Sequence, residues 1–131
     1  MSEIGKILVV DDNPKYLQDA LPMYGYEVQV ATDGVQALKL LARTNLKENS
    51  FDLILLDMRM RGMSGPEFLL EFEKRQPEIF KKVPVVLLSG LDQVPVTKAV
   101  GFIRKPFSID HFLAAVHRFI AQGTDLQKYK H

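Results

Sequence analysis

The feature that most constrains this chain is a short apolar run, Leu53 to Leu56, which ends on the carboxylate of Asp57. An uninterrupted apolar run of this length is typical of a strand buried on both faces, as in a parallel sheet. Such a strand would carry Asp57 out of the core at its carboxyl end. Because ligands of open α/β sheets bind outside the carboxyl ends of the strands, the sequence predicts that Asp57 is the chemical centre.

Strand-like and helix-like segments alternate about five times, which predicts an α/β fold with one parallel sheet and helices on both faces. Four more strands are predicted, and the second of them in the chain, which alternates polar and apolar residues, is expected near an edge. The four are Lys6–Val10, Glu27–Val30, Val83–Leu88 and Val100–Ile103. The clearest amphipathic helix follows Ser108, its predicted cap, and we expect Gly123 to end it.

Two further helix starts have capping signals. Asp33 precedes a helical stripe of apolar residues, and Ser64 and Glu67 have the spacing of a capping box. The opening helix, from Pro14 to about Met23, is predicted to be short because it contains Pro22. These signals place the polar strand ends in loops that lead into helices.

Length and composition indicate one ordinary globular domain. The chain has 131 residues, of which 47% are hydrophobic and 25% charged, and its net charge of +1 gives no reason to expect direct nucleic-acid binding. It has no cysteine, no signal-peptide pattern and no apolar run near the roughly 20 residues of a membrane helix. We therefore expect a cytoplasmic protein without membrane insertion, with a domain over residues 1–123 and a polar tail over 124–131.

Polar residues stand at the ends of the predicted strands. They are Asp11, Asp12, Asp57, Ser89 and Lys105. In a parallel sheet these side chains meet along one edge, where three close carboxylates repel unless a proton or a cation neutralises them. Mg²⁺ fits oxygen ligands of this kind, and a lysine and a hydroxyl can bind phosphate oxygens. The set predicts a phosphoryl-transfer site in which Asp57 is the nucleophile.

The sequence resembles the receiver domain of two-component response regulators. The matching pieces are Asp11-Asp12, Asp57, Ser89-Gly90 and Lys105-Pro106-Phe107, in that order, and the resemblance covers about residues 5 to 121. It implies a flavodoxin-like (βα)5 doubly wound parallel sheet. The strand order 2-1-3-4-5 is the one known for such sheets, and it makes the strands that end at Asp11 and Asp57 neighbours.

The resemblance also implies a role for each site residue. Asp57 would accept a phosphoryl group from a phosphohistidine of a histidine kinase or phosphotransfer protein. The chain would catalyse its own phosphorylation and dephosphorylation, acting as a regulator on a downstream protein. Asp12, Asp57 and the backbone carbonyl of Arg59 would bind Mg²⁺, with Asp11 helping through water.

Three more positions are carried over from the family. Lys105 would bridge to the phosphate, Ser89 would follow it inward, and Phe102 matches an aromatic rotamer-switch position. The Lys105–Pro106 bond is expected to be cis, as X-Pro bonds can be. Packing of Phe102 in a buried strand is nearly as plausible as switching, and Met58, Met60 and Met63 are expected to pack in a loop.

The segment between the fourth and fifth strands departs from the family. Only nine residues, Leu91 to Ala99, separate Gly90 from the fifth strand, whereas a crossover with its helix takes at least about 10–12. Pro95 is also poorly tolerated inside a helix. We therefore expect a short or missing fourth helix and an altered face there. Arg61 stands where the family commonly has proline, and Arg59 and Arg61 are candidates to contact a partner or to shield the site.

Two other functions compete with the phospho-switch. A receiver-like docking module would keep the fold and signal without phosphorylation, and the reduced fourth helix favours it. An aspartate-nucleophile phosphatase would need a cap or extra loop, for which this chain has no room. The chain is expected to be either a single-domain regulator or a piece of a longer one, and the intact set of five polar residues favours the phospho-switch.

Overall fold

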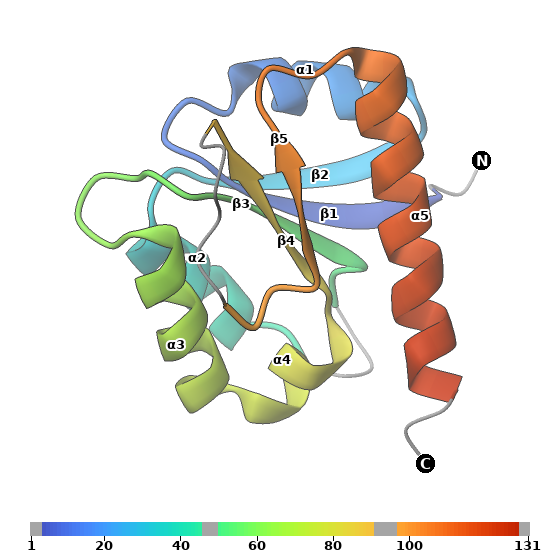
Figure 1. Ribbon diagram of the computed structural model, residues 1–131. Helices are drawn as coiled ribbons and strands as arrows, with labels where there is room; N and C mark the ends of the chain where they lie inside the picture. Colours follow the sequence, from blue (N-terminus) through green and yellow to red (C-terminus); the bar gives the residue numbers. More distant parts are fainter. Residues whose placement is uncertain (1–3, 46–49, 91–96, 129–131) are drawn as a thin grey trace.

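The computed structural model describes residues 4–45, 50–90 and 97–128, and for residues 123–128 it describes the backbone alone. Five parallel strands form one sheet in the order β2-β1-β3-β4-β5 (Figure 1). The strands are β1 (Gly5–Val10), β2 (Tyr26–Ala31), β3 (Leu53–Asp57), β4 (Val85–Ser89) and β5 (Gly101–Arg104). The helices are α1 (Lys15–Met23), α2 (Gly34–Ala42), α3 (Gly65–Arg75), α4 (Pro77–Lys82) and α5 (Ile109–Lys128). The predicted fold class and strand order are confirmed.

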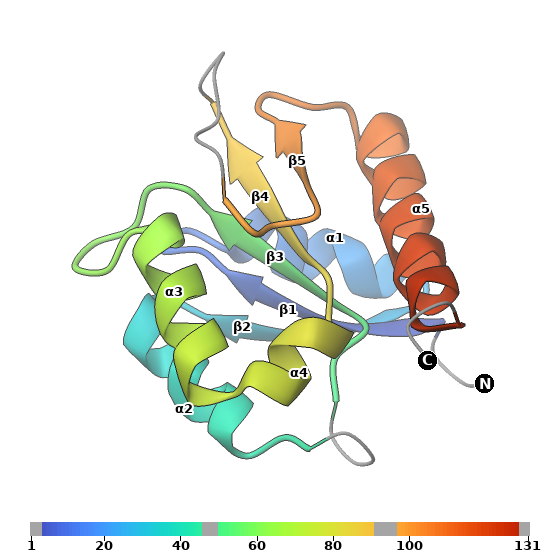
Figure 2. The same ribbon diagram turned by 60° about the horizontal axis from the view of Figure 1, so that its bottom comes forward.

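Helices cover both faces of the sheet (Figure 2). On one face α2, α3 and α4 pack against side chains such as Leu8, Ile54 and Leu87. On the other face α1 and α5 pack against alternate residues of the same strands, such as Leu55 and Leu88. Each inner strand therefore contributes to two cores, which is why its sequence is continuously apolar.

The apolar run of β3 has the burial that its sequence predicted. All four residues from Leu53 to Leu56 are fully buried, because β3 has β1 on one side and β4 on the other. The alternating strand β2 lies at an edge, also as predicted. Burial on both faces fixes the register of β3, and so it fixes where Asp57 leaves the core.

The crossover from β3 to β4 contains a helix that the sequence analysis missed. After α3 ends, α4 begins with Pro77 in its first turn, where proline needs no backbone donor. Its Ile79 is buried, and the Phe80 ring packs edge-on against Phe72 at 5.3 Å between centroids. Six residues are too few for a recognisable helical period, so only this packing reveals α4.

The crossover from β4 to β5 is short. Gly90 and residues 97–100 are not helical, which agrees with the predicted shortening. The remaining part of the segment for which a short or missing helix was predicted, residues 91–96, lies outside the described residues. The Lys98 ammonium pairs with the Glu73 carboxylate of α3 at 2.7 Å, so the end of this crossover is held against α3.

The expectation that Phe102 lies in a buried strand is wrong. β5 is an edge strand, and its alternate side chains face different sides of the sheet. Ile103 packs in the core with α5, whereas Phe102 points the other way and is 49% exposed. The apolar sequence of this strand suggested burial, but it does not show whether the strand lies inside the sheet or at its edge.

The expectation that Gly123 ends the last helix is also wrong. α5 passes Gly123 and continues to Lys128. A glycine inside a helix costs only about 1 kcal/mol, which helix-forming neighbours such as Gln122 and Gln127 can offset. The domain boundary at residue 123 stays a prediction. In the part of the chain that the structure describes, none of the helices combines the length and the apolar character that crossing a membrane requires.

The predicted capping box of α3 is formed. The Ser64 hydroxyl accepts a hydrogen bond from the Glu67 backbone N–H at 3.2 Å, and the Glu67 carboxylate accepts one from the Ser64 N–H at 3.5 Å. The predicted caps Asp33 and Ser108 also accept backbone hydrogen bonds at the starts of α2 and α5. These contacts set where each helix leaves the functional edge of the sheet.

We predict that Ser64→Ala lowers the free energy of unfolding by about 1 kcal/mol, because the Glu67 N–H loses its acceptor. Urea denaturation measures the change. Ser64→Thr keeps a capping oxygen and serves as the control, with an expected loss below about 0.5 kcal/mol. Equal losses in the two variants would show that the hydroxyl contact is not what stabilises this helix start.

Candidate functional site

Three aspartates from two neighbouring strands meet at one edge of the sheet. Asp11 and Asp12 directly follow β1, and Asp57 is the last residue of β3. Because β1 and β3 pair in parallel, both end at the same edge. One carboxylate oxygen from each aspartate lies within 4.8 Å of the other two. The structure thus brings together the three carboxylates that the sequence placed at this edge.

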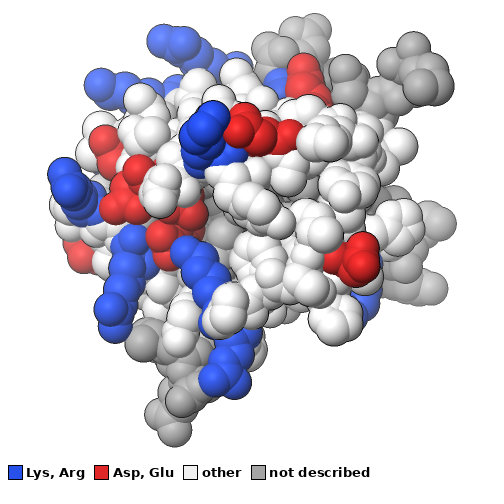
Figure 3. Space-filling view, turned by 90° about the horizontal axis from the view of Figure 1, so that it is seen from above, with Lys and Arg blue, Asp and Glu red and all other residues white. Residues whose placement is uncertain are grey.

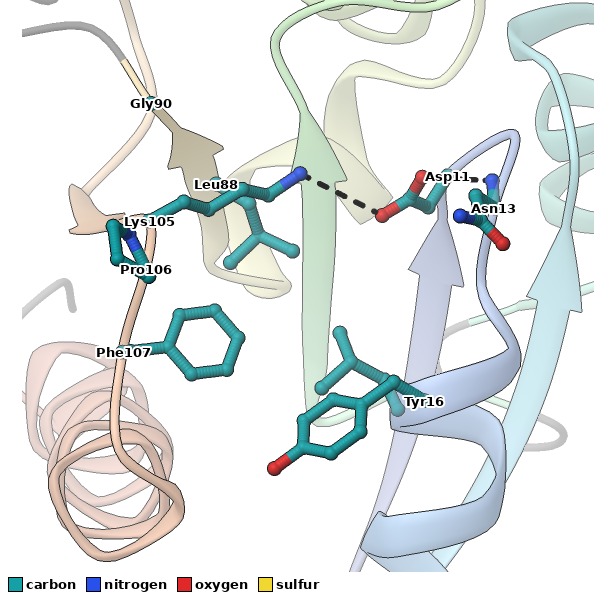
Figure 4. Close-up of a pocket in the computed structure, with 9 residues that line it drawn as sticks. Asp11, Asn13, Tyr16, Leu88, Gly90, Lys105, Pro106 and Phe107 are labelled. Carbon is teal, nitrogen blue, oxygen red and sulfur yellow. Dashed lines mark hydrogen bonds and ion pairs between the residues drawn. The ribbon is translucent and has the colours of Figure 1, made fainter.

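Lys105 comes to the same place from β5. Its Nζ lies 3.3 Å from Asp57 Oδ1. The same Nζ lies 3.9 Å from Asp11 Oδ2, the ion pair drawn in Figure 4. Its backbone N–H donates to the Ser89 carbonyl at 2.7 Å, which extends the pairing of β4 and β5 by one residue. The Lys105–Pro106 bond is cis, as expected. Backbone pairing therefore places a cation between two carboxylates.

Backbone donors hold two of the three carboxylates in place. Asp11 and Asp57 are buried, whereas Asp12 is exposed. The Asn13 N–H donates to Asp11 Oδ1 at 2.9 Å, and the Arg59 N–H donates to Asp57 Oδ1 at 3.3 Å. On the face seen in Figure 3, basic and acidic side chains lie next to one another, mostly in the left half of the view.

Burial makes Asp11 unusually difficult to ionise. The pKa of the Asp11 carboxyl is raised to about 6, chiefly by burial and also by the nearby negative charge of Asp57. The Asn13 N–H and the Lys105 ammonium lower the same pKa, but they do not offset burial. The site thus carries more negative charge near neutral pH than its own lysine neutralises.

This shortage of positive charge fits a bound cation. Carboxylate oxygens are the ligands that hard divalent ions prefer, and Asp11, Asp12 and Asp57 present three of them within 4.8 Å. A divalent ion there would remove the cost of ionising Asp11. These three residues could therefore hold a metal.

Ser89 and Arg59 line a hollow of about 260 Å³ over Asp57, together with Met58, Gly90 and Lys105. The Ser89 side chain is buried at the end of β4. Phe102 is not among the described residues that line this hollow, because it faces outward from β5. Met58 is buried, and Met60 and Met63 pack against the core, as expected for loop packing.

Gly65 is a close neighbour of Asp57 that the sequence analysis missed. A Cβ built on Gly65 would lie 2.9 Å from the Asp57 carbonyl oxygen and 3.2 Å from Met58 Cα. The Gly65 N–H also donates to the Met58 carbonyl at 3.2 Å. The first turn of α3 can approach the end of β3 this closely only because residue 65 has no side chain. Spacing in the sequence gives no signal for such a contact.

A second, larger hollow was also missed. Its apolar part is formed by Tyr16, Leu17, Leu88, Pro106 and Phe107, and we call it the apolar hollow. Its polar end includes Asp11 and Lys105, which belong to the acidic site. The sequence analysis did not place Tyr16 near Phe107, because segments about 90 residues apart must fold together before they face each other.

Comparison with known proteins identifies a family that has this fold and this kind of site. A model of the response regulator receiver domain matches residues 7–117. This chain belongs to the response regulator receiver family. The acidic pocket of Asp11, Asp12 and Asp57 fits the phosphorylation site of that family.

Relatives of this receiver domain include proteins of very different length. It is 34% identical to sporulation initiation phosphotransferase F of Bacillus subtilis, over 88% of this chain and 93% of that protein. It is 32% identical to the uncharacterized transcriptional regulatory protein YkoG of Bacillus subtilis, and 33% identical to the transcriptional regulatory protein ZraR of Escherichia coli. These matches cover 92% and 88% of this chain, but only 53% of YkoG and 26% of ZraR.

Solved structures show the same fold. The receiver domain is similar to the response regulator TrrA of Thermotoga maritima in complex with Mg(2+)-BeF, with a TM-score of 0.72, 30% identity and coverage of 88% and 99% of the two chains. It is also similar to the receiver domain of the sensor histidine kinase PA1611 of Pseudomonas aeruginosa, with a TM-score of 0.76, 25% identity and coverage of 89% and 98%. That structure has a magnesium ion coordinated in its active-site cleft.

We predict that, without divalent ions, the receiver domain loses stability as the pH rises from about 4 to about 6. The folded protein holds the Asp11 proton more tightly than the unfolded chain, because the folded pKa of about 6 exceeds the ordinary value of 3.8. The loss is on the order of 1–3 kcal/mol and is measured by urea denaturation in EDTA.

Two comparisons isolate this effect. Asp11→Asn should flatten the pH dependence, because it removes the group that titrates. Adding Mg²⁺ to wild type should stabilise it more at pH 7.5 than at pH 4.5, where a proton competes for Asp11. The same pH dependence in wild type and Asp11→Asn would contradict the assignment to this carboxyl.

We predict that Gly65→Ala lowers the free energy of unfolding by about 1–3 kcal/mol, because the new methyl group meets backbone atoms of β3 that cannot rotate away. Gly90→Ala is the matched control, since a Cβ there would have no atom of the described residues within 4 Å. Thermal or urea unfolding measures both. A loss in Gly90→Ala as large as in Gly65→Ala would rule out the close approach to Asp57 as the cause.

Proposed function

We propose that Asp57 accepts a phosphoryl group from a phosphohistidine and that the modified domain then changes its binding to a downstream protein. The observation that supports this most strongly is the position of Asp57. It is buried at the end of β3, 3.3 Å from the Lys105 ammonium and beside two further carboxylates. A nucleophilic carboxylate next to cationic charge is what phosphoryl transfer requires.

We propose Mg²⁺ as the cation of this site. Asp12, Asp57 and the backbone carbonyl of Arg59 would hold it, and Asp11 would act through water. The raised pKa of Asp11, caused chiefly by burial, supports a site that is completed by a divalent ion. When bound, the ion would neutralise charge on the transferring phosphoryl group. The magnesium named in the two related structures supports the choice of ion.

In the proposed reaction, a carboxylate oxygen of Asp57 attacks phosphorus. An O–P bond forms to Asp57 and the donor N–P bond breaks, with its electron pair remaining on the imidazole nitrogen, which then takes up a proton. Lys105 is positioned to bind a phosphoryl oxygen, since its Nζ already lies beside Asp57. Positioning and charge supply most of the rate in such transfers, so these few side chains suffice.

Release of the phosphoryl group and the resulting switch complete the proposal. Water would attack the acyl phosphate, so the domain would catalyse both its phosphorylation and its dephosphorylation. The Ser89 hydroxyl, which lines the hollow over Asp57, would donate to a phosphoryl oxygen and move toward it. Phe102 has room to change its rotamer because it is half exposed. Both movements would favour one of two packings of the domain that differ little in free energy.

We propose a histidine kinase or a phosphotransfer protein as the donor, and a cytoplasmic setting in which such donors act. Support comes from membership of the receiver family and from the likeness to a phosphotransferase over 93% of that relative's length. The likeness to ZraR does not identify the downstream protein, because this chain spans only 26% of that relative.

We predict that acetyl phosphate with Mg²⁺ adds one phosphoryl group to the domain and that Asp57→Asn abolishes the addition, because the nucleophilic oxygen is lost. Intact-protein mass spectrometry measures the product. Asp52→Asn is the matched control, since Asp52 precedes the opposite end of β3 and binds the Lys6 N–H. EDTA should prevent the addition in wild type.

A screen of phosphorylated histidine kinases then tests the donor. No modification of Asp57 by acetyl phosphate or by any kinase would falsify the phospho-switch. If partners also bound wild type and Asp57→Ala equally well, the chain would be a docking module that signals without phosphorylation.

A further inference from the structure

A third hollow lies between α3 and the end of the crossover from β4 to β5. It has about 380 Å³, and we call it the α3 groove. Figures 1 and 2 show the segment that leads into β5 passing beside α3, and the ion pair of Lys98 with Glu73 joins the two at 2.7 Å. The residues that line the groove are Pro66, Leu69, Leu70, Glu73, Thr97 and Lys98. Its wall along α3 is therefore mainly apolar, and its polar groups lie toward the crossover.

Leu70 is the exposed wall of the α3 groove. It is 67% exposed, whereas its neighbour Leu69 is buried. The buried residues Phe68, Leu69 and Phe72 face the core, so Leu70 stands on the outer side of the helix. An exposed leucine directly beside an apolar hollow places a projection and a matching recess on one surface. Such a surface can be complementary to itself, as a dimer with a two-fold axis requires.

Charged residues on the outer side of α3 fit the same kind of contact. Glu67 lies in the first turn and Lys74 in the last, and both are exposed. They are seven positions apart, so they lie on one side of the helix with Leu70 between them. At three and four positions from Glu67 the sequence has no basic residue, and Glu71 there is acidic. The charge of Glu67 is therefore not balanced by a cation one turn away on its own helix.

We propose that two copies of this chain form a two-fold dimer through α3, in which Leu70 of each copy enters the α3 groove of the other. The two α3 helices would run antiparallel, with the axis beside the midpoint of positions 70 and 71. Glu67 and Lys74 lie about one turn on either side of that midpoint, so Glu67 of each copy would lie opposite Lys74 of the other. A second copy fits better than an unrelated partner, because one helix supplies the projection, the recess and both charges.

The size of the contact determines the affinity that we expect. A contact through one helix of each copy buries less than the roughly 800 Å² per partner of a standard stable interface, so the dimer should be transient. A dissociation constant on the order of 10–100 µM is expected for such a contact. Both acidic edges stay accessible in this dimer, because Leu70 lies more than one turn along α3 from Gly65, the residue that abuts Asp57.

Sedimentation velocity of the unmodified chain, over concentrations that bracket the expected constant, tests the proposal. We expect Leu70→Glu to raise the dissociation constant at least about tenfold, because it places a charge at the apolar centre of the contact. Val35→Glu is the matched control, since Val35 is 53% exposed on the neighbouring helix α2. It should leave self-association unchanged.

Charge reversal tests the antiparallel arrangement. Lys74→Glu should raise the dissociation constant about fivefold, because each copy would then place Glu67 opposite a second carboxylate. Adding Glu67→Lys to Lys74→Glu should restore the constant to within about twofold of the wild type, since both pairs are re-formed with their signs exchanged. A structural role of Lys74 within its own copy would not produce this rescue. Urea denaturation of every variant checks that the fold is retained.

Three results would overturn the proposal. The chain could sediment as a monomer at all concentrations, Leu70→Glu could weaken the dimer no more than Val35→Glu, or the double charge reversal could fail to restore it. Because no phosphodonor is present in these measurements, they do not depend on modification of Asp57. The phospho-switch and the dimer are thus tested separately.

Discussion

Like charges held together at the edge of an apolar sheet are the constraint on which this receiver domain depends. Asp11 and Asp57 cannot separate, because the strands that carry them are paired and buried on both faces. Their repulsion is opposed by one ammonium, at 3.3 Å and 3.9 Å, and by two backbone donors. The stability of the hydrophobic core thus maintains an arrangement that is unfavourable by itself, and this leaves the edge receptive to a cation and to a phosphoryl group.

Much of the fold and the site could be predicted from the sequence because both depend on strand ends. A continuous apolar run fixed β3 at the centre of the sheet, and the alternation in β2 fixed an edge. Once the sheet is parallel, Asp11, Asp57 and Lys105 must converge, whatever the details of the helices. Capping signals such as Ser64 depend only on neighbouring residues, and the predicted capping box is formed in the structure.

The parts that could not be predicted depend on contacts between distant segments or on small energy differences. α4 has six residues and owes its place to packing on α3. Gly123 costs α5 too little to end it. The exposure of Phe102 follows from the edge position of β5, and the face of Tyr16 toward Phe107 exists only after folding. In each case the residue type is compatible with two environments, and only the tertiary arrangement selects one.

The hydrogen bond from the Lys105 N–H to the Ser89 carbonyl gives the site a mechanical property. It links the strand that carries the Ser89 hydroxyl directly to the segment that carries the Lys105 ammonium. A displacement of Ser89 would therefore act on β5, the outermost strand, which carries the half-exposed ring of Phe102. The backbone pairing of β4 and β5, which this hydrogen bond extends, thus links the surroundings of Asp57 to the edge of the sheet.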